Sequence, residues 1–76
     1  MIQLIKQLNN LHLVILPSYD IWFSYETPIA VRVRGETYIS NNEWSSTTGK
    51  HLNYISRDKS IRIPHSDILK IIEEEL

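Results

Sequence analysis

The strongest constraint on the fold is a strict alternation of side chains from Ile29 to Arg34, followed by a glycine. A period of two places alternate side chains on opposite faces of an extended strand, so one face of this strand is expected to be buried. Gly35-Glu36 is predicted to form a tight turn, because glycine adopts the positive φ that such turns need. The chain then returns through residues 37–39 as the second strand of a hairpin.

Two further strands are predicted upstream of this hairpin. Residues 11–16 are a short apolar run rich in β-forming side chains, and a proline ends it. Residues 20–25 alternate strictly, and Trp22 lies opposite the larger apolar set, where it is either a packed side chain or a platform for stacking on a base. Pro28 separates the two hairpins, because proline cannot donate a hydrogen bond to a sheet ladder. Residues 61–63 could add an edge strand.

A helix is predicted in the segment 42–57, where the side chains of one face recur at offsets of four, four and three from Trp44 to Ile55. Ser45 or Ser46 is expected to be the N-cap, because a hydroxyl there can accept a free backbone N–H of the first turn. Trp44 is expected to belong to the core and to act as a hydrophobic staple at the start of the helix. The face that packs on the sheet is predicted to consist of Trp44, Thr48, Leu52 and Ile55.

Helical spacing also occurs at both ends of the chain. Residues 1–10 are predicted to form a short helix, with an extra strand as the alternative. Residues 66–76 are predicted to form an amphipathic helix with Ser66 as its N-cap. The run Glu73–Glu75 lies at the negative end of the helix dipole, and we expect it to be solvated rather than paired with basic residues from the middle of the chain. The apolar side of the N-terminal helix would be Ile2, Leu4, Ile5 and Leu8.

These elements predict an α+β fold: a small antiparallel sheet of three to four strands packed against two helices, plus a short N-terminal helix. Residues 1–76 are expected to form a single small domain, near the lower length limit for a core that is stable alone. A second copy of the chain, as in a homodimer, would add buried surface. The chain has no cysteine, no apolar run near the roughly 20 residues of a membrane span and no cleavable leader pattern, so we expect a soluble, unexported protein.

Charge is distributed unevenly along the chain, although the formal net charge is only −1. Residues 27–64 contain six basic and three acidic side chains, whereas residues 65–76 contain one basic and four acidic side chains. Helical spacing gathers polar and basic side chains on the second face of the 42–57 helix. The excess of basic over acidic side chains in residues 27–64 is modest for a nucleic-acid-binding protein. The candidate contact residues for a protein partner or a nucleic acid are Arg32, Arg34, Thr47, Lys50, His51, Tyr54 and Arg57.

No catalytic, metal or cofactor site is predicted. The three histidines lack the close spacing of zinc ligands, and no cysteine supplements them. The segment 47–50 partly matches a phosphate-binding loop, but Trp44 stands where the motif needs glycine and His51 where it needs serine or threonine. Ser45, His51 and Asp58 could be written as a catalytic triad, but chance supplies such a trio in any chain of this size. We therefore expect a protein that is not an enzyme.

Two segments resemble a family of small uncharacterised proteins found in viruses and plasmids of bacteria and archaea. They are residues 23–30, Phe-Ser-Tyr-Glu-Thr-Pro-Ile-Ala, and residues 44–53, Trp-Ser-Ser-Thr-Thr-Gly-Lys-His-Leu-Asn. The most specific part is the Ser-x-Thr-Thr-x-Lys-His segment at residues 45–51. The resemblance covers about half of the chain and leaves both terminal elements outside the pattern. It implies an accessory protein of a mobile element, expressed in the host cytoplasm, with no assigned activity.

The polar residues of the 45–51 segment have two interpretations. The preferred one is a structural hydrogen-bond network in which Ser24 or Thr27 is tied to the start of the helix, so that the segment determines the fold. The other is a recognition surface formed by Thr47, Lys50 and His51. For the protein as a whole, we expect a protein-interaction module with an unknown protein partner, and the alternative is a small nucleic-acid-binding regulator.

Overall fold

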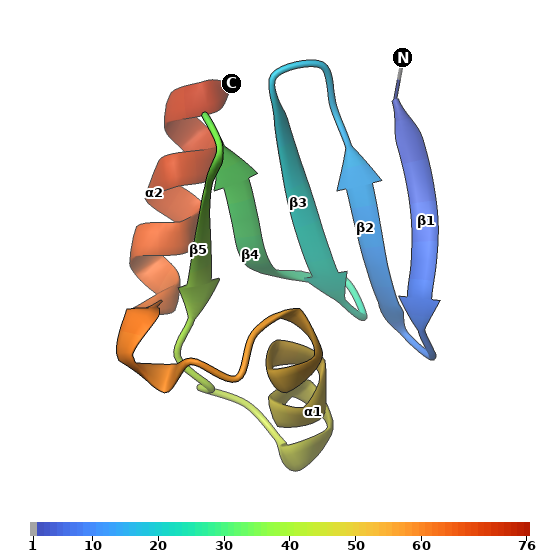
Figure 1. Ribbon diagram of the computed structural model, residues 1–76, viewed down its shortest axis with the longest axis vertical. Helices are drawn as coiled ribbons and strands as arrows, with labels where there is room; N and C mark the ends of the chain where they lie inside the picture. Colours follow the sequence, from blue (N-terminus) through green and yellow to red (C-terminus); the bar gives the residue numbers. More distant parts are fainter. Residues whose placement is uncertain (1) are drawn as a thin grey trace.

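The computed structural model describes residues 2–76 and consists of one six-stranded sheet and two α-helices (Figure 1). The first five strands form an antiparallel meander, and the short sixth strand pairs in parallel with the fifth. The strands are β1 (Gln3–Leu8), β2 (Leu11–Ile15), β3 (Tyr19–Ser24), β4 (Thr27–Val33), β5 (Glu36–Ser40) and β6 (Arg62–Ile63). The helices are α1 (Ser46–Ile55), the 3₁₀ turn η1 (Lys59–Ile61) and α2 (His65–Glu75).

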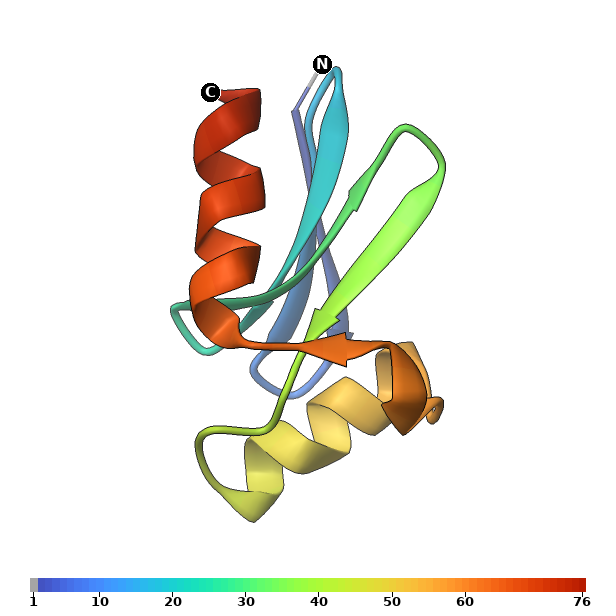
Figure 2. The same cartoon turned by 90° about the vertical axis from the view of Figure 1, so that its left-hand side faces the viewer.

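The two α-helices pack against different parts of the sheet. Figure 2 shows α2 standing along one side of the sheet and α1 lying across its lower end. Leu52 of α1 joins a buried cluster that includes Leu11 and Trp22, whereas Ile68 of α2 joins a second cluster with Ile21 and Val31. Neither helix within residues 2–76 is long and apolar enough to cross a membrane.

β4 is buried on both faces, contrary to the prediction of one buried face. Ala30 pairs with Trp22 on the side of α1, and Val31 pairs with Ile21 on the side of α2. Both β4 residues are fully buried. β4 is buried on both faces because it lies near the middle of the sheet, with side chains of α1 packed on one face and side chains of α2 on the other. The small Ala30 side chain leaves room for the indole opposite it.

The hairpin of β4 and β5 confirms the prediction made from the alternation, but its turn lies one residue earlier. Val33 pairs with Glu36, so the turn consists of Arg34 and Gly35. Their φ angles are 52° and 79°. Positive φ at both positions is what a type I′ turn requires, and this turn matches the right-handed twist of the strands.

Replacing Gly35 with alanine is expected to lower the free energy of unfolding by about 1–2 kcal/mol, because an L-residue in the left-handed region brings its Cβ too close to the backbone. Apart from Gly35 and its two chain neighbours, no atom lies within 4 Å of a Cβ at this position, so the cost comes from the local backbone conformation. Urea unfolding measures the change. Gly35→Asn is the control and should lose less, since asparagine tolerates this region. Equal stability of the glycine and alanine proteins would contradict the turn assignment.

The predicted sheet of three to four strands and the predicted N-terminal helix are both wrong. The chain begins with strand β1, and β6 makes the sheet mixed rather than antiparallel. β1 lies at the edge of the sheet farthest from α2 (Figure 1). Apolar side chains remain exposed along it, so no single buried face imposes a period of two on its sequence. The spacing of Ile2, Ile5 and Leu8 therefore imitates a helix.

The starts of the two helices differ from the predictions made for their N-caps. α1 begins after Ser45 as predicted, but the Ser45 hydroxyl makes no capping hydrogen bond. The predicted start of α2 at Ser66 is wrong: α2 begins at His65, whose backbone N–H donates to the Glu43 carboxylate at 2.9 Å. Trp44 is 39% exposed and meets the His65 ring edge to face at 4.7 Å, so its predicted place in the core is also wrong.

Candidate functional site

A buried hydrogen-bond network joins α1 to the sheet. The Ser24 Oγ atom, at the end of β3, lies 2.7 Å from His51 Nδ1 and 3.2 Å from Thr48 Oγ1. On the other side of the ring, His51 Nε2 lies 3.1 Å from the backbone carbonyl oxygen of Asn9. None of the three side chains is more than 6% exposed. The network therefore connects the β1–β2 turn, β3 and α1 in the interior of the protein.

The direction of each hydrogen bond follows from the partners. The Asn9 carbonyl can only accept, so His51 Nε2 carries a proton and donates it. In the neutral ring, Nδ1 then accepts a hydrogen bond from the Ser24 hydroxyl. The Ser24 oxygen in turn accepts from Thr48. Every polar side-chain atom of the network has a partner, which is the condition under which buried polar groups stabilise a fold.

This arrangement supports the interpretation of the 45–51 segment as a fold determinant, with Ser24 as the residue tied to the helix. It corrects one assignment: His51 does not lie on the exposed polar face of α1. Tyr25 covers the imidazole, with ring centroids 6.1 Å apart. The ring hydrogen-bonds to Ser24 and Asn9, not to Ser45 or Asp58. Because Ser24 is 2% exposed, the serine–histidine pair is closed to solvent.

Gly49, in the 45–51 segment, also has a structural reason. The Asn42 side chain folds over the start of α1, accepting a hydrogen bond from the Trp44 N–H at 3.1 Å and donating one to the Ser45 carbonyl at 3.2 Å. A Cβ on Gly49 would lie 2.9 Å from the Asn42 Nδ2 atom. Glycine therefore leaves the space that the Asn42 amide occupies.

The exposed side of α1 and the end of β1 together form an open hollow of about 320 Å³. Helical spacing places Lys50, Tyr54 and Arg57 beside one another, as predicted. Leu8 and Asn53 complete the lining. No carboxylate lines this hollow, and within residues 2–76 neither Lys50 nor Arg57 forms an ion pair. The hollow is thus positively charged, with an apolar wall.

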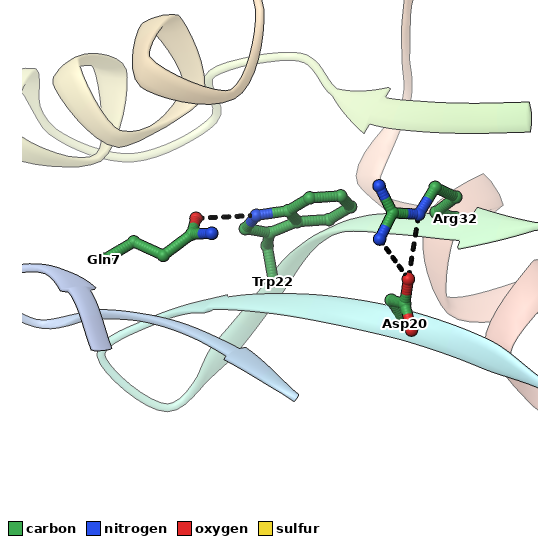
Figure 3. Close-up of polar contacts among 4 residues, drawn as sticks. All are labelled: Gln7, Asp20, Trp22 and Arg32. Carbon is green, nitrogen blue, oxygen red and sulfur yellow. Dashed lines mark hydrogen bonds and ion pairs between the residues drawn. The ribbon is translucent and has the colours of Figure 1, made fainter. Parts of the chain in front are cut away.

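Arg32 does not join this hollow. Its guanidinium forms an ion pair with Asp20 on the neighbouring strand, with Nε 2.8 Å from Oδ2, and lies 5.3 Å from the centre of the Trp22 ring (Figure 3). The Trp22 indole N–H donates to Gln7 Oε1 at 2.9 Å. Trp22 is only 7% exposed, which decides between its two interpretations: it is a packed side chain rather than a stacking platform.

Arg34 and Thr47 also lie outside the hollow. Arg34 is in the β4–β5 turn, at the end of the sheet opposite α1, where its Nη1 lies 3.3 Å from Glu75 Oε2 (Figure 1). Glu75 is therefore not simply solvated as predicted, although Glu73 and Glu74 are exposed. Thr47 is exposed in the first turn of α1 but does not line the hollow. The seven predicted contact residues thus do not form one surface.

A family model matches most of the chain. Residues 4–70 match a family of unknown function, DUF8033. The chain belongs to this family. No curated protein and no solved structure matches it. The DUF8033 match includes nearly all of β1 and the first half of α2, so both elements belong to the family's pattern, although the resemblance in residues 23–30 and 44–53 left them outside it.

The sequence did not predict Leu8 and Asn53, which line the hollow beside α1, or Asn9, whose backbone carbonyl accepts a hydrogen bond from His51. Leu8 and Asn9 depend on β1 being a strand that returns beside β2. The alternative interpretation of residues 1–10 as an extra strand would have predicted the positions of Leu8 and Asn9. Within residues 2–76 no group of three His, Cys, Asp or Glu side chains is placed to hold a metal ion.

Asp58, which follows the hollow residue Arg57, is expected to make the stability of this DUF8033 protein depend on acid pH. The Ser60 hydroxyl and N–H both donate to the Asp58 carboxylate, and these hydrogen bonds lower the pKa of Asp58 below its ordinary value of 3.8. The stabilisation is present above that value and is lost as the pH falls through the lower folded-state pKa. Urea unfolding at about pH 6 and about pH 3 should show a larger loss for the wild type than for Asp58→Asn. Equal losses would contradict this role.

Proposed function

We propose that this DUF8033 protein is a non-enzymatic protein-interaction module whose binding surface is the outer edge of β1. The observation that carries the proposal is the exposure of apolar side chains along an edge that no strand of residues 2–76 covers: Leu4 is 69%, Ile5 41% and Leu8 37% exposed. Folded proteins usually protect edge strands with several charges, a proline or a covering element. β1 has a single charge, on Lys6, and a shift in register between Lys6 and Leu8.

An edge of this kind fits an extended segment of another chain. Its free backbone N–H and C=O groups can pair with a strand, while its exposed side chains contact alternate side chains of the partner. Because this is the mode of strand addition, the partner need not be folded before it binds. A second copy of the chain is one partner that would satisfy it, through antiparallel pairing of two β1 strands.

The buried Ser24–His51 pair supports a non-enzymatic role. A catalytic nucleophile and base must reach the substrate, and here both side chains lie in the interior with every hydrogen bond made. The hollow beside α1 contains cationic, phenolic and amide groups but no carboxylate or imidazole to act as a general base near neutral pH.

Nucleic-acid binding is the second candidate, and the Lys50–Arg57 pair favours it. The other basic residues predicted as contacts weaken it: Arg32 and Arg34 are each paired with an acid, and His51 is buried. Two cations are few beside the roughly 6–10 phosphate contacts of a typical DNA-binding protein. The test is fluorescence anisotropy with labelled DNA and RNA at low and near-physiological salt. Binding that falls steeply with salt and is lost in Lys50→Ala/Arg57→Ala would favour this candidate.

The interaction proposal is tested by adding charge to the edge. The wild type is expected to self-associate in sedimentation velocity or to capture partner proteins on a column. Leu4→Lys/Ile5→Lys should abolish whichever of these the wild type shows. The control is Leu69→Lys, which adds a charge to α2 at a side chain that is 44% exposed. If the edge variant and the control behave like the wild type, β1 is not the binding surface. Circular dichroism checks that both variants are folded.

The biological setting is a proposal of its own. The resemblance of residues 23–30 and 44–53 to small proteins of viruses and plasmids supports an accessory role for a mobile element in the cytoplasm of its host. Fractionation of cells that express the protein from its own genetic element tests the location. Recovery with the envelope or outside the cell would contradict it.

A further inference from the structure

We propose that the partner segment is an extended acidic peptide, whose backbone pairs with β1 and whose aspartate or glutamate side chain enters the hollow between Lys50 and Arg57. This inference rests on the proposed function and names the chemistry of the partner. It starts from one residue, Leu8, which belongs to both parts of the surface: it is the last residue of β1 and it lines the hollow.

The first step is geometric. A strand that pairs with β1 would lie about 4.8 Å from it, along the edge where Leu4 and Ile5 are exposed. Followed toward Leu8, this edge leads to the hollow formed with α1. A peptide residue near Leu8 is therefore close enough for its side chain to reach Lys50 or Tyr54. The strand edge supplies affinity through the backbone, and the hollow supplies a preference for one side chain.

The second step is the charge of the hollow. Lys50 and Arg57 line it, and the Asn53 Oδ1 atom accepts a hydrogen bond from Arg62 Nη2 at 3.2 Å, so a third cation lies behind the amide. Arg62 Nε is buried and has no hydrogen-bond partner within residues 2–76. The nearby carboxylate of Asp58 is engaged with Ser60. A carboxylate from outside would find two lining cations, Lys50 and Arg57, that form no ion pair within residues 2–76.

The third step separates a peptide from a nucleic acid. The approach to the hollow is apolar, because Ile5 and Leu8 are exposed along it on the face of α1, and Tyr54 is 54% exposed at the hollow itself. A phosphate backbone needs a row of cations, whereas a β-strand peptide presents alternate side chains that can cover this apolar edge. One cationic hollow at the end of an apolar edge fits a single acidic side chain in an otherwise apolar strand.

The experiment uses labelled peptides of about eight residues, the length of a strand, built from alternating valine and threonine. One set has a glutamate near one end, a matched set has glutamine there, and a third has lysine. Anisotropy titrations should show the glutamate peptide binding at least about tenfold more tightly than the glutamine peptide, because hydrogen bonds to charged groups are the stronger ones. Hydrogen exchange should slow at the amides of β1 when this peptide binds.

Three variants locate the effect. Lys50→Ala/Arg57→Ala should remove the preference for glutamate but keep the binding of the glutamine peptide, whereas Leu4→Lys/Ile5→Lys should weaken both. Lys59→Ala/Lys70→Ala is the matched control, because it removes the same charge from exposed side chains that do not line the hollow, and it should retain the preference.

The outcomes distinguish this inference from the proposed function. Equal binding of the glutamate and glutamine peptides, lost in the edge variant, would overturn the acidic partner and leave the interaction module in place. No binding of any peptide would also overturn it, and the capture experiment would then decide the proposed function separately. Slower exchange in α1 without any change in β1 would show that the carboxylate binds alone, and would overturn the strand pairing.

Discussion

Replacing His51 with alanine is expected to lower the free energy of unfolding by about 3 kcal/mol. The substitution leaves the Ser24 hydroxyl without its acceptor and the Asn9 carbonyl without its donor, and it opens a cavity where a ring that is 4% exposed now packs. A buried polar group that loses its partner cannot recover it from water. Urea unfolding followed by tryptophan fluorescence measures the loss.

The neighbouring position supplies the control for this prediction. Lys50→Ala truncates an exposed side chain on the same helix and should change the free energy of unfolding by no more than about 0.5 kcal/mol. Ser24→Ala should cost about 1–3 kcal/mol, and its combination with His51→Ala should cost less than the sum, because the two side chains share one hydrogen bond. A His51→Ala protein as stable as Lys50→Ala would show that the buried histidine is kept for another reason.

The segment at residues 45–51 therefore combines two kinds of residue. Thr48, Gly49 and His51 are explained by contacts within the fold. Lys50 has no such explanation, since it is exposed and makes no hydrogen bond or ion pair among the described residues. A function that depends on this segment would consequently act through its exposed residues, among them Thr47 and Lys50, while Thr48, Gly49 and His51 maintain the scaffold.

The parts of the fold that the sequence predicted are those with a complete local pattern. The β4–β5 hairpin had both an apolar alternation and a glycine able to adopt positive φ, and α1 had helical spacing with a serine at its start. β1 had no such pattern, because an edge strand that is exposed on both faces is not required to alternate. β6 has two residues, and only its position beside β5 makes it a strand.

The candidate site was predictable to the extent that it lies on one helix. Lys50, Tyr54 and Arg57 are neighbours because of helical spacing alone. The assignment of His51 to the same exposed face was wrong. The buried side of α1 is wider than a single row of side chains and includes the His51 imidazole as well as Thr48 and Leu52. Arg32 and Arg34 failed for a different reason: their acidic partners, Asp20 and Glu75, are distant in sequence and are brought close only by the completed fold.

The second large effect is expected at the contact that holds α2 against the sheet. Ile68→Ala should lower the free energy of unfolding by about 3–4 kcal/mol, because Ile68 is fully buried against Ile21 and Val31 and its truncation leaves a cavity. Since a 76-residue chain buries little surface in total, this loss is a large part of the roughly 5–15 kcal/mol that stabilises a typical domain. Thermal and urea unfolding, each followed by circular dichroism, measure it.

The adjacent residue of α2 tests whether burial is the cause. Leu69→Ala removes a side chain of the same size that is 44% exposed, and it should cost less than about 1 kcal/mol. If α2 is part of the same cooperative unit as the sheet, helical circular dichroism and the fluorescence of Trp22 should report one transition in Ile68→Ala. The fluorescence is measured with Trp44 replaced by phenylalanine, because Trp44 packs against His65 of α2. Separate transitions would show that α2 can leave the sheet while the strands stay folded. Equal losses in the Ile68 and Leu69 variants would contradict the packing of α2 through Ile68.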